Sequence, residues 1–170
     1  VATAGFDTRN PVKRLKAAKA RGMKLIVIDP RRSETAQFAN LLIQPLPGED
    51  VPVLAGIIRI ILAEGWEDQD FCRDHVGDLE ALRAAVAPFT PEYVAARADI
   101  PQGQLREAAE MFARDARRGP AASCTGANMG PHSNLAEHLV EARAAVFDGR
   151  ITDAKTITAL FWAERELGAT

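Results

Sequence analysis

The spacing of apolar positions along this chain predicts helices and strands in alternation. Residues 11–21 carry apolar side chains at helical intervals and are followed by Gly22, a residue suited to the position just past a helix end. Residues 23–28 then form an apolar run rich in β-branched side chains, which is typical of a strand covered on both faces of a parallel sheet. A second short run at residues 41–43 predicts another strand.

The rest of the pattern is mainly helical. Residues 51–64 have a clear helical period that ends at Gly65. Further helices are predicted at residues 68–75, 79–86, 101–117, 133–146 and 153–167, and one more begins at Thr90 and Pro91. Residues 120–124 favour a weak strand. This order of elements indicates a helix-rich α/β fold with a mainly parallel sheet and helices on both of its faces.

Composition and charge narrow the class of protein. The chain has 170 residues, of which 47% are hydrophobic and 26% charged, as expected for one globular domain. The net charge of −2, with both signs interspersed, argues against nucleic acid or an anionic membrane as partner. No apolar stretch is long enough for membrane insertion and no export signal is visible, so we expect a cytoplasmic protein. Cys72 and Cys124 lie far apart without a C-x-x-C motif, which predicts reduced, packed thiols.

The sharpest candidate site follows the first predicted strand. Asp29 ends this strand, and Pro30 cannot extend its hydrogen-bonded ladder. Ligands of open α/β sheets bind outside the carboxyl ends of the strands, where a carboxylate accepts hydrogen bonds from ribose hydroxyls or a guanine N–H edge. The next two residues, Arg31 and Arg32, would neutralise phosphate or stack on a base. The alternative is that Asp29 only terminates the strand and that both arginines are solvated.

Two other loops have weaker signals. In residues 45–50, Gly48 permits an unusual backbone angle and Asp50 is placed to cap the next helix, and capping alone would explain Asp50. If the two strands are neighbours, this loop adds a carboxylate to the crevice beside Asp29. Residues 125–132 offer backbone N–H donors to an anion or a pterin edge, although a simple strand-to-helix loop has the same pattern. No G-x-G-x-x-G, hydrolytic motif or metal-ligand spacing occurs, so we assign no NAD or FAD site, catalytic residue or metal ligand.

Several of these segments together resemble the molybdopterin oxidoreductases, the group of formate dehydrogenases, nitrate reductases and dimethyl sulfoxide reductase. Residues 21–36 (RGMKLIVIDPRRSETA) are similar to the strand-and-loop signature of that family, and residues 47–50 are similar to its P-G-T-D turn, with Glu49 in place of Thr. The other matching segments, in the family's order, are residues 65–71, 90–95, 100–101 and 126–130. We therefore assign residues 1–147 to one cofactor-binding domain and residues 148–170 to a C-terminal amphipathic helix.

The resemblance implies a Rossmann-like domain that holds the guanosine end of one pterin dinucleotide in a molybdenum or tungsten bis-molybdopterin-guanine-dinucleotide cofactor (Mo-bis-MGD). The residues that it implies for this cofactor are Asp29, Arg31, Arg32, Gly48 and Asp50 on the guanosine side, and Gly126 and Met129 on the pterin side.

This chain departs from the family in several respects. The family's enzymes are several times longer, and their protein ligand to the metal has no counterpart here. The cysteine cluster for a [4Fe–4S] centre is absent too, so we expect no iron–sulfur cluster in this chain. The implied partners are the remaining domains or subunits of such an oxidoreductase. Residues 149–160 instead resemble the last helix of ADP-ribose-type Nudix pyrophosphatases, but the Nudix box is absent and we do not expect hydrolysis.

Three functions follow from these patterns. The first is a cofactor-binding domain or fragment of a molybdenum or tungsten oxidoreductase, inactive by itself. The second is a stand-alone α/β domain that binds a guanine nucleotide or a partner chain without redox activity. The third is a remnant that binds no ligand. The sequence leaves open whether this chain is itself an enzyme.

Overall fold

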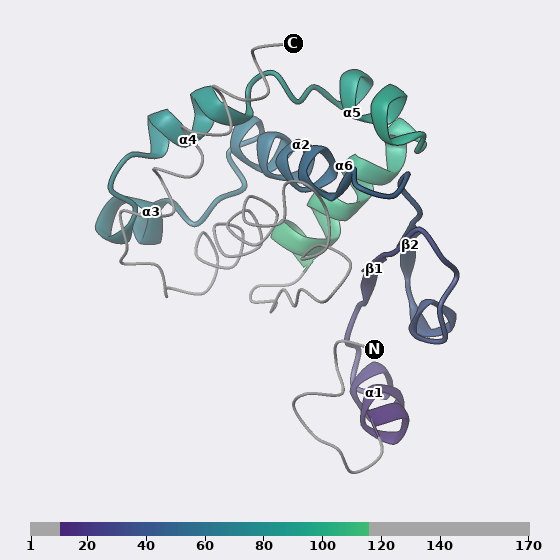
Figure 1. The fold of residues 1–170 in the computed structure, drawn as a ribbon. Coiled ribbons are helices and arrows are strands. Elements are labelled where there is room, and N and C mark those ends of the chain that lie inside the picture. Colours follow the sequence, from purple (N-terminus) through teal and green to yellow (C-terminus); the bar gives the residue numbers. More distant parts are fainter. Residues whose placement is uncertain (1–10, 116–170) are drawn as a thin grey trace.

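A computed structural model describes residues 11–115 of the chain (Figure 1). In chain order the elements are α1 (Pro11–Ala20), β1 (Ile26–Ile28), the 3₁₀ helix η2 (Thr35–Phe38), β2 (Leu41–Ile43), α2 (Asp50–Ala63), α3 (Gln69–His75), α4 (Leu79–Val86), α5 (Pro91–Ala98), α6 (Gln102–Glu110) and the π-helical turn η3 (Met111–Asp115). Both strands and the six helices predicted between residues 11 and 115 are confirmed. The elements predicted at residues 120–124, 133–146 and 153–167 lie outside the described residues.

The two strands form a parallel pair, in which Ile26 lies opposite Leu41 and Ile28 opposite Ile43. Parallel pairing with helical connections confirms the α/β class. The first strand is shorter than the predicted run of residues 23–28. The reason is local, because the side chain of Asn40 accepts the backbone N–H of Leu25 at 3.1 Å and so takes the place of a ladder bond. The three residues of β1 are half-buried, whereas the sequence predicted a strand covered on both faces.

The core is centred on α2. Its helical period is so rich in Val, Leu and Ile that nearly every residue from Val51 to Leu62 is buried. Helices α4, α5 and α6 pack around α2, and α6 also contacts β2. The largest fully buried side chains of the described residues come from four of these elements: Ile43, Val53, Ile57, Ile61, Val94 and Leu105. Helix α5 approaches α2 closely at Gly56, where an added Cβ would lie 3.0 Å from Cγ2 of Val94.

A buried ion pair joins the end of α2 to α4. Arg83 donates to the carbonyl oxygen of Leu62 and to the carboxylate of Glu67, whose side chain is only 3% exposed. The second carboxylate oxygen of Glu67 is buried and has no hydrogen-bond partner among the described residues. This pair therefore fixes the connection between α2 and the shorter helices that follow it.

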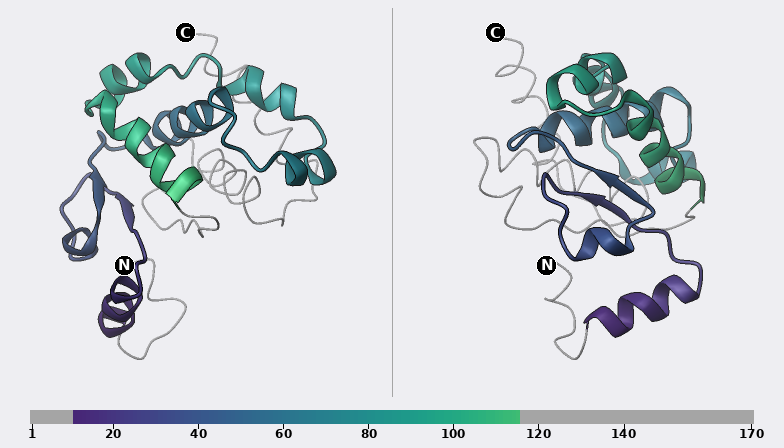
Figure 2. Two further views of the ribbon diagram at one scale, coloured as in Figure 1. Left: turned by 180° about the vertical axis from the view of Figure 1, so that it is seen from behind. Right: turned by 90° about the vertical axis from the view of Figure 1, so that its right-hand side faces the viewer.

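The elements separate into two regions (Figures 1 and 2). Helices α2 to α6 form one layer, which we call the helical layer. Strands β1 and β2 lie at one side of it, with α1 beyond them at the far end of the described structure. None of the helices described between residues 11 and 115 is both long and apolar enough to cross a membrane.

Candidate functional site

The carboxyl ends of β1 and β2 bring two loops side by side. The backbone N–H of Asp29 donates to the carbonyl oxygen of Ile43 at 3.1 Å, which extends the strand pairing by one step. The side-chain amide of Gln44 then donates to the carbonyl oxygen of Pro30 at 3.2 Å. The sequence predicted that these loops would be neighbours if the strands were, and the parallel register makes them so.

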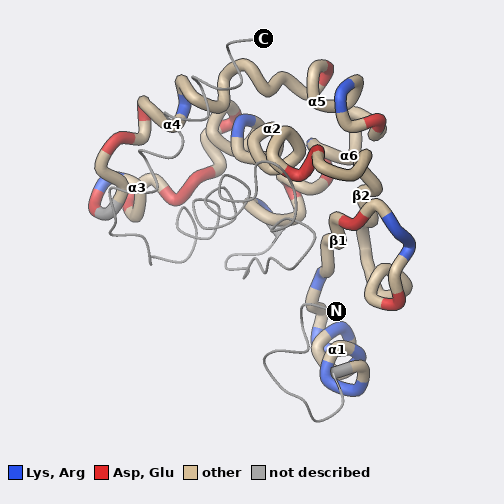
Figure 3. The backbone as a smooth tube through the Cα atoms, viewed as in Figure 1, with Lys and Arg blue, Asp and Glu red and all other residues tan. Residues whose placement is uncertain are grey.

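The loop after β1 is organised by Asp29. Oδ1 of Asp29 accepts the backbone N–H of Arg31 at 2.8 Å, a turn in which an aspartate side chain binds the backbone two residues later. The guanidinium Nε of Arg31 lies 3.8 Å from the same oxygen, but the arginine side chain is 86% exposed. Arg32 is exposed as well. Figure 3 shows acidic and basic residues close together in the loop after β1. The two arginines are therefore available to an anion in solution.

The loop after β2 turns sharply into α2. Gly48 has φ of 93°, in the left-handed region that glycine adopts without strain, and the N–H of Glu49 closes the turn on the carbonyl oxygen of Leu46 at 3.1 Å. The prediction that Asp50 caps this helix is wrong. Asp50 is the first residue of α2, and Glu49 occupies the cap position without a side-chain cap bond. The carboxylate of Asp50 is consequently not consumed by capping.

Asp50 lies in an environment that disfavours its charge. Partial burial raises the pKa of its carboxyl above 3.8, and the negative charges of Asp29 and Glu49 raise it further against the effect of a backbone hydrogen bond. The parallel register and the bond from Gln44 to Pro30 place the loops that carry Asp29 and Asp50 side by side, and the charge of Asp29 contributes to the raised pKa of Asp50. Of the predicted site residues, the structure thus groups Asp29, Gly48 and Asp50, with Arg31 and Arg32 beside Asp29; Gly126 and Met129 lie outside the described residues.

The sequence reasoning missed an ion pair behind this site. Glu49 accepts a hydrogen bond from Nε of Arg97 at 2.6 Å, and Arg97 also donates from Nη1 to the hydroxyl oxygen of Tyr93 at 2.7 Å. These two bonds raise the pKa of Arg97 above its usual value. Two signals pointed toward the group. Tyr93 and Arg97 are one helical turn apart, and Glu49 replaces the family's Thr.

The arrangement offers hydrogen-bond acceptors and positive charges at one edge of the sheet. Two partly buried carboxylates on adjacent loops offer hydrogen-bond acceptors, and a guanine base and ribose hydroxyls supply matching donors. The two exposed arginines next to them match the charge of phosphate groups. The residues present therefore fit the guanosine end of a pterin dinucleotide. Within residues 11–115, no group of His, Cys, Asp or Glu side chains could hold a metal ion.

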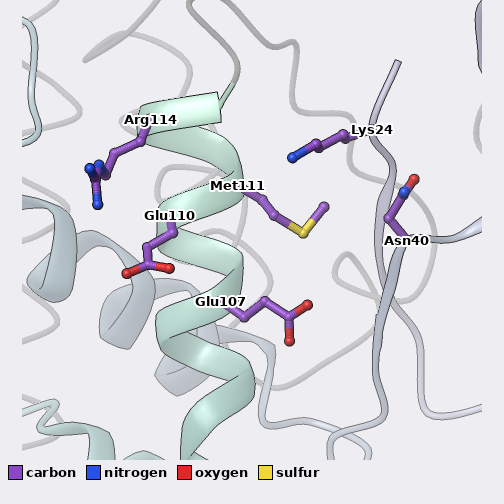
Figure 4. A pocket seen from close by; sticks show the side chains of 6 residues that line it. All are labelled: Lys24, Asn40, Glu107, Glu110, Met111 and Arg114. Carbon is purple, nitrogen blue, oxygen red and sulfur yellow. The ribbon is translucent and has the colours of Figure 1, made fainter. Parts of the chain in front are cut away.

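A cavity of about 560 Å³ opens at the other end of the strands (Figure 4). Lys24 and Asn40, which precede β1 and β2, line it from one side, and residues of α6 and η3 line the other. Its charged lining residues are Lys24, Glu107, Glu110 and Arg114. Because both positive and negative groups line it and it lies at the amino ends of the strands, we do not assign the nucleotide to this cavity.

No family model matches the chain. The alpha subunit of F420-dependent formate dehydrogenase 1 from Methanococcus maripaludis is 35% identical over 100 residues, which are 59% of this chain and 15% of that protein. Acetylene hydratase from Syntrophotalea acetylenica is 36% identical over 101 residues, 59% of this chain and 14% of that protein. The solved structure of acetylene hydratase from Pelobacter acetylenicus superposes with a TM-score of 0.78 at 28% identity, covering 89% of this chain and 21% of that one.

These matches show that the chain is an α/β protein that corresponds to one segment of much larger enzymes. Its homologues include formate dehydrogenases, acetylene hydratase and a dimethyl sulfoxide/trimethylamine N-oxide reductase. This chain is homologous to part of the molybdopterin oxidoreductases. It spans about one seventh of the length of the first two curated relatives, 15% and 14%. The resemblance of residues 149–160 to Nudix pyrophosphatases lies outside the described residues.

Proposed function

We propose that this chain is the part of a molybdenum or tungsten oxidoreductase that holds the guanosine end of one molybdopterin guanine dinucleotide. The observation that carries the proposal is the side-by-side position of the two loops that bear Asp29 and Asp50, at the carboxyl ends of parallel strands. Homology to enzymes of the molybdopterin family supports the same function. The bound cofactor would supply the redox-active metal centre of the parent enzyme.

Each residue of the site has a distinct part in this proposal. The carboxylates of Asp29 and Asp50 accept hydrogen bonds from the ribose hydroxyls and the N–H edge of the guanine. Gly48 permits the turn that delivers Asp50. Arg31 and Arg32 balance the charge of the pyrophosphate. Gly126 and Met129 are proposed for the pterin side on the family resemblance alone.

Binding of GDP tests the guanosine part of the proposal, because GDP carries the base, the ribose and a diphosphate. Calorimetric titration of the full chain should show GDP binding, with ADP bound more weakly. Asp29→Ala should weaken GDP binding by about 1–3 kcal/mol, the range for loss of a hydrogen bond to a charged group. Asp74→Ala is the matched control, because Asp74 is an exposed carboxylate on α3, remote from the strands. Equal GDP affinity in the wild type and Asp29→Ala would sink the assignment.

The cofactor part needs protein purified from the cells that make it. Acid treatment should release GMP together with molybdenum or tungsten, measured by chromatography and elemental analysis. GMP without either metal would instead favour a guanine-nucleotide-binding domain with no redox role. Protein that releases no nucleotide and binds no GDP would contradict both functions.

A further inference from the structure

The turn that delivers Asp50 is fastened to α5 at two points. The backbone N–H of Leu46 donates to the carbonyl oxygen of Ala98 at 3.0 Å. Three residues later, Oε2 of Glu49 accepts from Nε of Arg97 at 2.6 Å. Asp50 follows Glu49 directly in the chain. The ion pair therefore holds the residue directly before Asp50 to α5.

Arg97 is itself held in place from the core. Its Nη1 donates to the hydroxyl oxygen of Tyr93 at 2.7 Å, and its guanidinium lies over the Tyr93 ring at 5.9 Å from the centroid. The ring of Tyr93 packs edge-on against buried Phe89, with centroids 6.1 Å apart. A continuous series of contacts thus runs from the core through Tyr93 and Arg97 to Glu49.

Arg97 also places a positive charge against the turn. Asp50 already faces the charges of Asp29, from the loop after β1, and of Glu49, from its own turn. The cation of Arg97, from α5, balances Glu49 in a pair whose side chains are 34% and 21% exposed. Without it, three carboxylates would meet around one small site with no compensating charge between Glu49 and Asp50.

We propose that Arg97 is a positioning residue for guanine nucleotide, holding the turn of residues 47–50 through its bond to Glu49. The inference rests on the proposed function. It adds a residue to which the sequence analysis gave no role, and one that acts through Glu49 and does not touch the ligand. Where the resembling P-G-T-D turn has Thr, this chain has Glu49, which forms an ion pair with Arg97.

Affinity for GDP is the first measurement. Arg97→Met should weaken GDP binding about tenfold, the order expected when a binding group is displaced and not removed. Glu49→Gln should have a similar effect, and Arg97→Met with Glu49→Gln should be no worse than either single change, because all three remove one interaction. Arg97→Lys should restore part of the affinity. Arg73→Met is the matched control, since Arg73 pairs with Asp70 and Asp74 on remote α3.

The pH dependence of GDP binding separates positioning from a general structural role. In Arg97→Met, the unbalanced Glu49 makes Asp50 harder to ionise, so the loss of binding on acidification should begin at a higher pH. Adding Glu49→Gln should move it back. A purely structural defect would lower affinity at every pH and leave this midpoint unchanged, and that result would overturn the inference.

Hydrogen exchange keeps the two proposals distinguishable. The amides of Leu46 and Glu49 should exchange faster in Arg97→Met and Glu49→Gln than in the wild type or Arg73→Met. If GDP binding depends on Asp29 but neither affinity nor exchange responds to Arg97, only the role of Arg97 falls. If the wild type binds no GDP, the proposed function and the positioning role both fall, and the exchange rates still report whether the pair holds the turn.

Discussion

The helical layer and the two-stranded sheet of this protein are stabilised in different ways. Helix α2 is buried along almost its whole length, and four helices follow it around the same core. The strands have three residues each, and β1 is only half-buried. Yet the carboxylates and arginines of the candidate site lie beside the strands. The buried core and most of the proposed binding site thus lie in different regions, and one short connection, residues 44–49, joins them.

The first prediction tests where the stability resides. Ile57→Ala should lower the free energy of unfolding by about 4 kcal/mol, because a fully buried isoleucine leaves a cavity among packed helices. Val12→Ala on α1 should cost less than about 0.5 kcal/mol, because Val12 is exposed. Urea denaturation measures both. Similar losses at the two positions would show that α1 and the sheet are as tightly packed as the helical layer.

The second prediction compares the Arg83–Glu67 pair with the Arg31–Asp29 pair. Arg83→Met should cost about 3 kcal/mol, because it leaves the buried carboxylate of Glu67 without its partner. Arg31→Met, in the loop after β1, should change stability by less than about 0.5 kcal/mol, because this arginine is exposed and its pair with Asp29 is long. The free energy of unfolding of the two variants, measured by urea denaturation, shows whether the Arg83–Glu67 pair stabilises the fold and the Arg31–Asp29 pair does not. A large loss in Arg31→Met would contradict this division.

The sequence predicted local structure well, because local signals determine it. Asp68, Asp78 and Thr90 accept hydrogen bonds from the third residue after them at the starts of α3, α4 and α5. The apolar patterns predicted both strands and a mainly parallel sheet. The loops of Asp29 and residues 47–50 were expected to be neighbours if the two strands were, and the register of β1 and β2 meets that condition. The fold class was therefore predictable, and so was the proximity of the two loops once the strands were paired.

What the sequence could not supply depends on contacts between distant segments. The Glu49–Arg97 and Glu67–Arg83 pairs join residues 48 and 16 positions apart, and no periodicity encodes them. The role of Asp50 was misjudged for a related reason. An acidic residue before an apolar helix is typical of a cap, and only the three-dimensional turn shows that α2 begins one residue earlier.

The third prediction compares two glycines. Gly56→Ala should destabilise by about 1 kcal/mol, because overpacking against buried Val94 outweighs the gain in helix propensity. Gly48→Ala should also cost about 1 kcal/mol, but through its positive φ, since open space surrounds it. Adding Val94→Ala should reduce the cost of Gly56→Ala and leave that of Gly48→Ala unchanged. Gly103→Ala, in α6 with open space and ordinary φ, is the control and should not destabilise.

The smallest predicted effect compares Asp50, at the start of α2 beside the strands, with Glu92 on α5. Because burial and neighbouring charge raise the pKa of Asp50, its contribution to stability is complete below pH 3.8 and declines as the pH rises through its folded-state pKa. Asp50→Asn should therefore stabilise the protein slightly at neutral pH and not at pH 3, while weakening GDP binding. Glu92 on α5 has a lowered pKa, caused first by a backbone hydrogen bond and then by Thr90, so its contribution is lost on acidification.

Glu92→Gln should accordingly destabilise at neutral pH and have no effect at low pH, the reverse of Asp50→Asn. Denaturation of both variants at the two pH values measures the difference directly. Opposite signs would mean that the ionised carboxylate of Glu92 stabilises the fold, whereas the ionised carboxylate of Asp50 destabilises it. Under our proposal, Asp50 is then present for ligand binding. If Asp50→Asn destabilised the protein at neutral pH, the ionised Asp50 would stabilise the start of α2. The proposed separation between residues that stabilise the core and residues that bind the ligand would then be wrong at Asp50.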